Sequence, residues 1–144
     1  MKKLLPLLLV SLIIGVILTG GCVSTETVPP NQETQIIENI TPPEAFALIQ
    51  DNQNNPDFVI IDVRTPEEFA DGHIENAINL DYYSETLRDE LNKLDKGKKY
   101  LIYCRSGNRS GKALNIMQEL NFREVYNMSG GILEWQAEGL PLTK

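Results

Sequence analysis

Cysteine, histidine and tryptophan are scarce in this chain of 144 residues, which has two cysteines, one histidine and one tryptophan. Structural zinc sites need several Cys and His side chains at short spacings, so the sequence predicts no metal site of that kind. The cysteines are Cys22, near the amino terminus, and Cys104. If Cys22 is modified, as the surrounding sequence suggests below, Cys104 has no partner for a disulfide within the chain.

Positive charge is also in short supply. The chain has 13 basic and 20 acidic residues, and its net charge is −7. Such a balance argues against binding to nucleic acid and against electrostatic attachment to anionic lipid. The chain also lacks a glycine-rich phosphate loop of the nucleotide-binding type, so no nucleotide cofactor, and no other cofactor, is expected.

Residues 1–22 have the pattern of an export signal. Lys2 and Lys3 precede an apolar stretch from Leu4 to Leu18, which is short for a membrane helix of about 20 residues. The small residues before Cys22, in Leu18-Thr-Gly-Gly-Cys22, indicate a lipoprotein signal in which this cysteine carries the lipid. An aliphatic residue usually stands where Thr19 is found, so an uncleaved amino-terminal anchor is the alternative. Both interpretations predict an extracytoplasmic protein attached to the cell membrane.

The rest of the chain divides into a tether and one domain. Residues 23–35 are polar, contain two prolines and lack apolar periodicity, which is typical of a flexible linker. In residues 36–144, short apolar runs such as Phe58–Asp62 alternate with amphipathic patterns such as Ser84–Leu94. This alternation predicts an α/β domain with a parallel sheet.

The most informative segment is Tyr100-Leu-Ile-Tyr-Cys-Arg-Ser-Gly-Asn-Arg109. An apolar strand ends at a cysteine, and a polar turn then leads into a helical pattern. Backbone N–H groups converge in such a loop, and the helix dipole favours negative charge, so the pKa of the Cys104 thiol is expected to lie below its usual value of roughly 8.5. The sequence therefore predicts a nucleophilic thiolate, with Gly107 permitting the turn.

Three blocks in this order resemble the rhodanese-type sulfurtransferase family. They are Asp62-Val-Arg-Thr-Pro-Glu-Glu-Phe69 with Gly72-His-Ile74, then Cys104–Arg109, then Gly130-Gly-Ile-Leu-Glu-Trp135. The resemblance implies a rhodanese-like α/β fold, with a central five-stranded parallel sheet flanked by helices. It also implies that Cys104 carries a persulfide between a small sulfur-containing anion, such as thiosulfate, and an acceptor that is a thiol or cyanide.

Roles for the neighbouring residues follow from the loop and from this resemblance. Arg109 is expected to be catalytic, either by orienting an anionic donor or, as we favour, by bonding the loop carbonyls with charge assistance. Arg105 is the candidate for direct contact with thiosulfate. The amides of the loop are expected to cradle a persulfide or an oxyanion, and Asp62 and Arg64 to be structural groups near the site. The substrate-binding residues are thus Arg105, Ser106, Gly107 and Asn108.

Two other functions fit part of the pattern. Cysteine-dependent phosphatases and arsenate reductases also combine a cysteine with an arginine, but with five residues between them, whereas four separate Cys104 from Arg109. The shorter loop favours the terminal sulfur of a persulfide over a phosphoryl group. A non-catalytic rhodanese-like binding module commonly loses the cysteine or the arginine, and both are present here. His73, the only histidine, is expected to be structural, not the base of a Cys–His pair.

Overall fold

The computed structural model describes residues 34–144. The predicted signal, residues 1–22, and the predicted tether up to residue 33 lie outside the described residues, and so does Cys22. Within residues 34–144, no helix is both long enough and apolar enough to cross a membrane.

The described residues form a five-stranded sheet in which every pair of neighbouring strands is parallel. The strand order is β1-β5-β4-β2-β3, so β4 occupies the centre. The predicted α/β fold, with a central five-stranded parallel sheet flanked by helices, is confirmed. The strands are β1 (Ile36–Ile40), β2 (Phe58–Asp62), β3 (Ile78–Asn79), β4 (Lys99–Tyr103) and β5 (Glu124–Met128).

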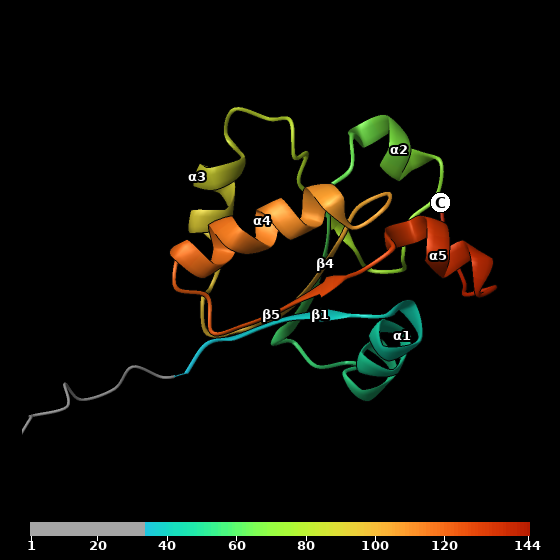
Figure 1. The fold of residues 1–144 in the computed structure, drawn as a ribbon, viewed down its shortest axis with the longest axis horizontal. Coiled ribbons are helices and arrows are strands. Elements are labelled where there is room, and N and C mark those ends of the chain that lie inside the picture. The colour runs from blue at the N-terminus through green and yellow to red at the C-terminus, as the bar shows by residue number, and fades with distance from the viewer. Residues whose placement is uncertain (1–33) are drawn as a thin grey trace, which may run out of the picture. The chain divides into compact units, whose positions relative to one another are not determined.

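Helices cover both faces of this sheet (Figure 1). One face packs against α3 and α4, and the other against α1 and α5. The short helix α2 follows β2 directly. The helices are α1 (Pro42–Asp51), α2 (Pro66–Ala70), α3 (Leu87–Asn92), α4 (Asn108–Glu119) and α5 (Gly131–Ala137).

Local sequence accounts for where two of the helices begin. Thr41 and Thr65 are the N-caps of α1 and α2, as their position before a proline predicts. Each threonine forms a capping box with the glutamate three residues later, Glu44 and Glu68 respectively. The third helix is shorter than the predicted Ser84–Leu94, because Ser84 and Thr86 bond to each other in a turn ahead of Leu87.

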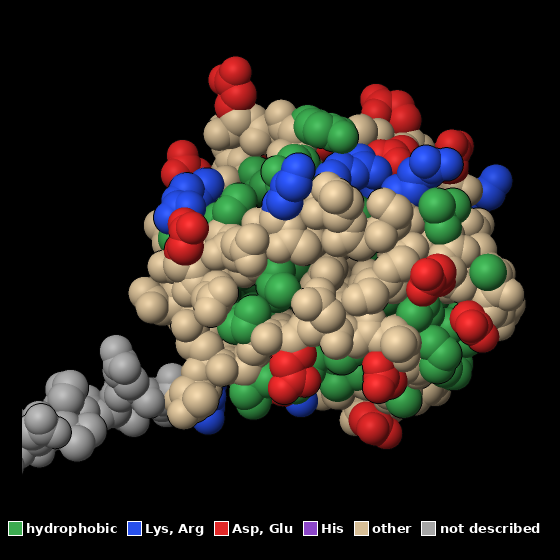
Figure 2. All heavy atoms as spheres, in the orientation of Figure 1, with side chains coloured by type: hydrophobic (Ala, Val, Ile, Leu, Met, Phe, Trp, Pro, Cys, Tyr) green, Lys and Arg blue, Asp and Glu red, His purple; other side chains and the backbone are tan. Residues whose placement is uncertain are grey.

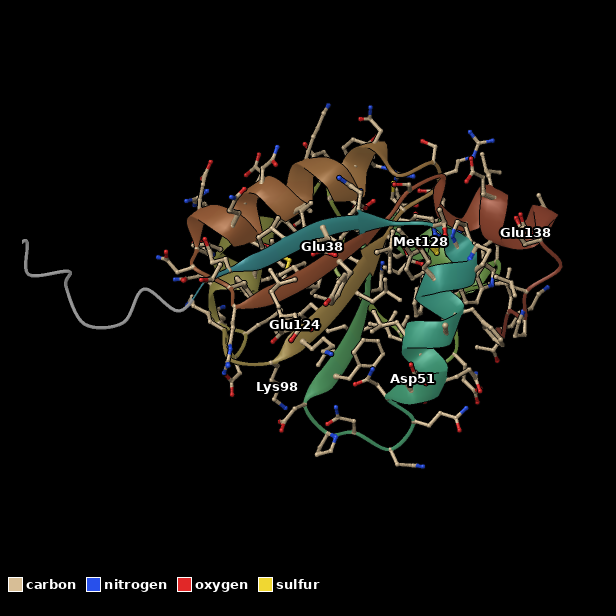
Figure 3. The ribbon with its side chains drawn as sticks, turned by 60° about the horizontal axis from the view of Figure 1, so that its bottom comes forward. Glu38, Asp51, Lys98, Glu124, Met128 and Glu138 are labelled. Carbon is tan, nitrogen blue, oxygen red and sulfur yellow. The ribbon has the colours of Figure 1, made fainter. Side chains whose placement is uncertain are left out.

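Alternation along β4 sends its side chains into two separate cores. Tyr100 and Ile102, together with Cys104, pack on the α3 and α4 side, while Leu101 and Tyr103 pack on the α1 and α5 side. All five are buried. Cys104 therefore follows the central strand at the carboxyl edge of the sheet, which is where open α/β sheets bind ligands. Figure 3 shows the two edges, with Met128 at the carboxyl end of β5 and Lys98 at the opposite edge.

Candidate active site

Cys104 lies beneath the loop that joins β4 to α4, and only 1% of its surface is exposed. Two donors point at its sulfur. The backbone N–H of Gly107 donates to Sγ at 3.2 Å, and the Ser110 hydroxyl donates to Sγ at 3.4 Å. Gly107 has φ +88°, a left-handed conformation that glycine adopts without strain and that turns the chain into α4. The loop is therefore closed around the sulfur atom.

The surroundings favour the thiolate form of Cys104. Burial raises the pKa of this thiol, but hydrogen bonds from the Ser110 hydroxyl and from the backbone N–H groups of Ser110, Ser106 and Gly107 lower it by more. The pKa of Cys104 is thus lowered from its ordinary value. Ser110 is completely buried and was not among the residues that the sequence singled out. Its place in the first turn of α4, which follows the Cys104 loop directly, could have suggested the contact.

The outer side of the loop is held by the first turn of α5. The backbone N–H of Ile132 donates to the carbonyl of Cys104 at 2.9 Å, and that of Leu133 donates to the carbonyl of Arg105 at 3.1 Å. Gly131 has φ +59°, and a Cβ atom there would lie 2.6 Å from the Arg105 carbonyl. Close contact with the loop carbonyls therefore explains why position 131, in the pair Gly130–Gly131, is a glycine. With the loop carbonyls bonded to α5, the loop N–H groups are left to face the sulfur.

Arg109 is held by a carboxylate. Its Nη1 and Nη2 donate to Glu68 Oε2 and Oε1 at 2.7 and 2.8 Å, and its guanidinium lies 5.5 Å from the ring centre of Tyr83. Hydrogen bonds from Arg109 lower the pKa of Glu68 to about 2. We expected Arg109 to bond the loop carbonyls, but its guanidinium bonds Glu68. The carbonyls of Cys104 and Arg105 accept hydrogen bonds from α5 instead. Glu68 was missed because the sequence does not show that α2 reaches this loop.

Asp62 and Arg64 form a buried ion pair at the carboxyl end of β2. Arg64 Nη2 lies 2.6 Å from Asp62 Oδ2, and it also donates to the Gly72 carbonyl at 2.7 Å. The side-chain amide of Asn79 donates to the carbonyls of both residues. These bonds tie β2, β3 and the segment before Ile74 together next to the site, and none of them reaches the Cys104 sulfur.

Positively charged side chains occur in the Cys104 loop and in the first turns of α4, although the chain as a whole is acidic. Arg105 and Lys112 are exposed, and Arg109 is partly exposed. Figure 2 shows Lys and Arg side chains in a band on one face of the molecule, with acidic side chains around it. The predicted contacts of Arg105 and of the Ser106, Gly107 and Asn108 amides with a bound anion stay predictions.

No group of three or more Cys, His, Asp or Glu side chains within residues 34–144 is placed to hold a metal ion. The ring of His73 stacks on Phe69 at 3.7 Å between ring centres, and its Nδ1 lies 3.0 Å from the Phe69 carbonyl oxygen. The contacts of Cys104 that favour its thiolate come from the loop and α4, not from an imidazole.

Comparison with known proteins identifies a family for this chain. The family model described as a rhodanese-like domain matches residues 45–138. A sulfurtransferase from Allochromatium vinosum is 34% identical over 99 residues, which cover 69% of this chain and 91% of that protein. A tRNA uridine(34) hydroxylase from an Enterobacter species is 32% identical over 124 residues. That match covers 79% of this chain but only 34% of the hydroxylase.

Solved structures with a similar fold include rhodanese-related proteins. A rhodanese-related protein from Thermoplasma volcanium superimposes with a TM-score of 0.58 at 31% identity, covering 76% of this chain and 98% of that one. A protein from Rhodopseudomonas palustris, described as a possible tyrosine phosphatase, gives a TM-score of 0.60 at 28% identity, covering 74% and 85%. Together with the buried Cys104 and its loop, these matches show that the chain belongs to the rhodanese-like domain family.

Proposed function

We propose that this protein is a sulfurtransferase in which Cys104 carries sulfane sulfur as a persulfide. The observation that carries the proposal is the pair of donors on Sγ, the Gly107 N–H at 3.2 Å and the Ser110 hydroxyl at 3.4 Å. They stabilise the thiolate, which is the nucleophilic form of cysteine. The sulfurtransferase relative from Allochromatium vinosum, which this chain matches over 91% of its length, supports the same chemistry.

The proposed reaction consists of two displacements. The Cys104 thiolate attacks the outer sulfur of thiosulfate, a new S–S bond forms, and sulfite leaves with the electron pair of the broken bond. An acceptor thiolate or cyanide then attacks the outer sulfur of the persulfide and restores the Cys104 thiolate. Negative charge thus moves onto the outer sulfur and back again, inside a loop whose N–H groups already point at it.

The loop length supports sulfur over phosphate as the transferred group. Four residues separate Cys104 from Arg109, so few N–H groups surround the sulfur and the cradle is narrow. Glu68 pairs with Arg109, which makes this guanidinium a weaker partner for any oxyanion, so the loop length and not Arg109 distinguishes the two functions. A phosphatase or arsenate reductase is therefore the less favoured alternative, although one structural neighbour is described as a possible tyrosine phosphatase.

A non-catalytic binding module is the second alternative. It would have no need of a thiol with a lowered pKa, nor of a serine completely buried against that thiol. Both features are present, so catalysis is favoured over binding alone.

The cellular location belongs to the same proposal. The sequence before residue 22 supports export, and Cys22 is the proposed lipidation site. We place the domain outside the cytoplasm, attached to the cell membrane by the lipid.

A transfer assay tests the proposed activity. The purified domain should convert cyanide to thiocyanate with thiosulfate as donor, with the parallel-line kinetics of a two-step exchange. Cys104→Ser should abolish the reaction, and Ser106→Ala, in the same loop, should retain most of it. A domain that hydrolyses aryl phosphates and leaves thiosulfate unchanged would contradict the proposal.

A further inference from the structure

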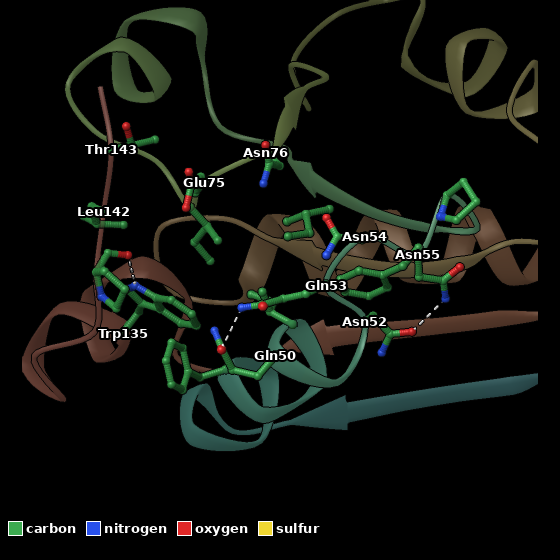
Figure 4. A pocket seen from close by; sticks show the side chains of 17 residues that line it. Gln50, Asn52, Gln53, Asn54, Asn55, Glu75, Asn76, Trp135, Leu142 and Thr143 are labelled. Atoms are coloured by element: carbon green, nitrogen blue, oxygen red, sulfur yellow. Dashed lines mark hydrogen bonds between the residues drawn. The ribbon is translucent and has the colours of Figure 1, made fainter.

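A cavity of about 760 Å³ lies between the carboxyl-terminal half of α1, the turn that follows it, and the chain's last residues. Its size is within the range of pockets that hold small organic ligands, roughly 300–1,000 Å³. Figure 4 shows side chains converging on it from separate segments. Gln53 and Asn54 come from the turn after α1, and Glu75 and Asn76 come from the segment before β3.

This cavity is separate from the Cys104 site. It is lined by Ile60 and Trp135, which belong to the core on the α1 and α5 face of the sheet. Cys104 belongs to the core on the opposite face. A ligand in the cavity would therefore have no contact with the sulfur, and the cavity needs an explanation other than sulfur transfer.

The floor of the cavity is apolar. Phe46, Phe58 and Trp135 contribute rings, and Phe46 packs edge-on against Trp135 at 5.9 Å between ring centres. The indole N–H of Trp135 is already used, because it donates to the Pro141 carbonyl at 2.9 Å. The indole therefore offers only carbon atoms to the cavity.

The rim carries side-chain amides with unused hydrogen-bonding groups and one carboxylate, that of Glu75. Gln53 Nε2 donates to Gln50 Oε1 at 2.8 Å, which leaves Gln53 Oε1 and Gln50 Nε2 for a ligand. Asn54 and Asn76 are exposed, and both have positive φ, +64° and +63°. Each of their amides offers a donor and an acceptor side by side, and the Glu75 carboxylate adds two acceptors.

The lining disfavours anionic ligands. It contains neither lysine nor arginine, so phosphates and carboxylates would bind without a counter-charge. β3 pairs only with Ile61 and Asp62 of β2, so Phe58 and Ile60 have no strand partner on that side, and an extended peptide is the competing occupant that the test below includes. A ligand that uses the whole lining carries no negative charge, has hydroxyl groups that both donate and accept, and presents an apolar face.

We infer that this cavity binds a neutral saccharide of about two sugar rings. The ring C–H face lies on Phe46 and Phe58, and the hydroxyl groups bond to Asn54, Asn76 and Glu75. Adjacent hydroxyls match a side-by-side donor and acceptor of an amide, or the two oxygens of a carboxylate. This binding is independent of whether Cys104 transfers sulfur.

Backbone NMR titration of the folded domain tests the inference with three probes, cellobiose, maltose and N,N′-diacetylchitobiose. Each is added up to roughly 20 mM, which detects dissociation constants in the millimolar range. At least one disaccharide should shift the amide signals of Gln53, Asn54, Glu75 and Asn76, and leave those of the Cys104 loop unchanged.

The combined variant Asn54→Gly and Asn76→Gly provides the critical comparison. Glycine keeps the positive φ at both positions, so the fold is retained while two amide side chains are lost. Affinity should fall about ten-fold, as expected for two hydrogen bonds. Asn121→Gly is the matched control, because Asn121 also has positive φ, +62°, and does not line the cavity. Its affinity should equal that of the parent.

Three results would overturn the inference. The first is that none of the disaccharides shifts the signals of the cavity residues. The second is that the double variant and Asn121→Gly bind equally well. The third is that trialanine shifts the cavity signals while the disaccharides do not, which would assign the cavity to peptides.

Discussion

The backbone of Gly131 lies directly against the carbonyl group of Cys104. A side chain at position 131 would collide with this carbonyl and with the carbonyl of Arg105, and the next residue, Ile132, donates its N–H to the Cys104 carbonyl at 2.9 Å. The first turn of α5 therefore fixes the orientation of the first two peptide groups of the catalytic loop. Because these carbonyls point toward α5, the following N–H groups are free to surround the sulfur.

Gly131→Ala should consequently damage both stability and sulfur transfer. Its Cβ would push the Cys104 carbonyl away, in addition to the cost of about 1 kcal/mol for a left-handed alanine. Gly139→Ala is the control, because Gly139 has φ +71° but nothing lies within 4 Å of the added carbon. Chemical denaturation should show a loss of about 1 kcal/mol for Gly139→Ala and about 3 kcal/mol for Gly131→Ala. Equal losses, with equal activity, would show that α5 does not shape the loop.

Ser110→Ala should raise the pKa of the Cys104 thiol. The Ser110 hydroxyl stabilises the thiolate, so its removal favours the protonated, unreactive form at a given pH. A hydrogen bond to a charged group contributes about 1.5 kcal/mol, which corresponds to a rise of about one pKa unit. The rate of reaction with iodoacetamide, measured against pH, should therefore begin to increase about one unit higher than in the parent, with little change at high pH.

The Ser106→Ala variant separates this effect from general damage to the loop. The Ser106 side chain is exposed, and it is the backbone N–H of this residue that acts on the thiolate. The iodoacetamide reaction rate of Ser106→Ala, plotted against pH, should therefore coincide with that of the parent. If Ser110→Ala also overlays the parent, the hydroxyl has no role in ionising Cys104.

Glu68→Gln should destabilise the domain in a way that depends on pH. The Arg109 bonds hold the pKa of Glu68 at about 2 in the folded state, below its ordinary 4.5. The ionised carboxylate therefore contributes stability in full above about pH 4.5, and this contribution is lost as the pH falls toward 2. The pair is partly exposed, so the loss at pH 7 should be about 1 kcal/mol by urea denaturation.

Glu67→Gln is the control for the preceding variant, since Glu67 lies in the same helical turn. The difference in stability between the two variants should be present at pH 7 and shrink below pH 4.5. A difference that stays constant down to the lowest pH at which the domain folds would contradict the role of the Glu68 carboxylate.

Much of the fold could be predicted because the signals are local. Buried strands such as β2 and β4 appear as continuous apolar runs. Thr41 and Thr65 are each followed by proline, a pattern that predicts the start of a helix. The error at Ser84, where the helix was predicted to begin, has a local cause as well. Ser84 and Thr86 bond to each other and delay the helix, which apolar periodicity alone does not reveal.

The sequence shows only part of the site, because several of its contacts join segments far apart in the chain. Cys104 and Gly107 lie in one loop, and the sequence shows them together. Glu68 reaches Arg109 from α2, and Gly131 reaches Cys104 from α5, so both contacts depend on how the helices pack. Sequence spacing determines which residues share a loop, but not which distant side chain neutralises an arginine.

The proposed lipid attachment predicts how the full-length chain is processed in cells. Cys22→Ala should block normal processing and leave a heavier precursor with residues 1–21 still attached. The parent should be found in the membrane fraction with its domain accessible from outside the cytoplasm, and a chain starting near Gln35 should be soluble because of its acidic surface. Mass spectrometry of membrane-extracted protein distinguishes a cleaved lipoprotein from an uncleaved anchor, because only the anchor retains Met1. A wholly cytosolic protein would contradict both forms of membrane attachment.

The intact mass of the domain after incubation with thiosulfate tests the central claim most directly. The domain should gain the mass of one sulfur atom, and should lose it again when cyanide or a thiol is added. Cys104→Ser should gain nothing, since Cys104 is the one cysteine within residues 34–144. A parent domain that remains at its original mass with excess thiosulfate, or a Cys104→Ser domain that gains the same mass, would contradict the assignment of Cys104 as the sulfur carrier.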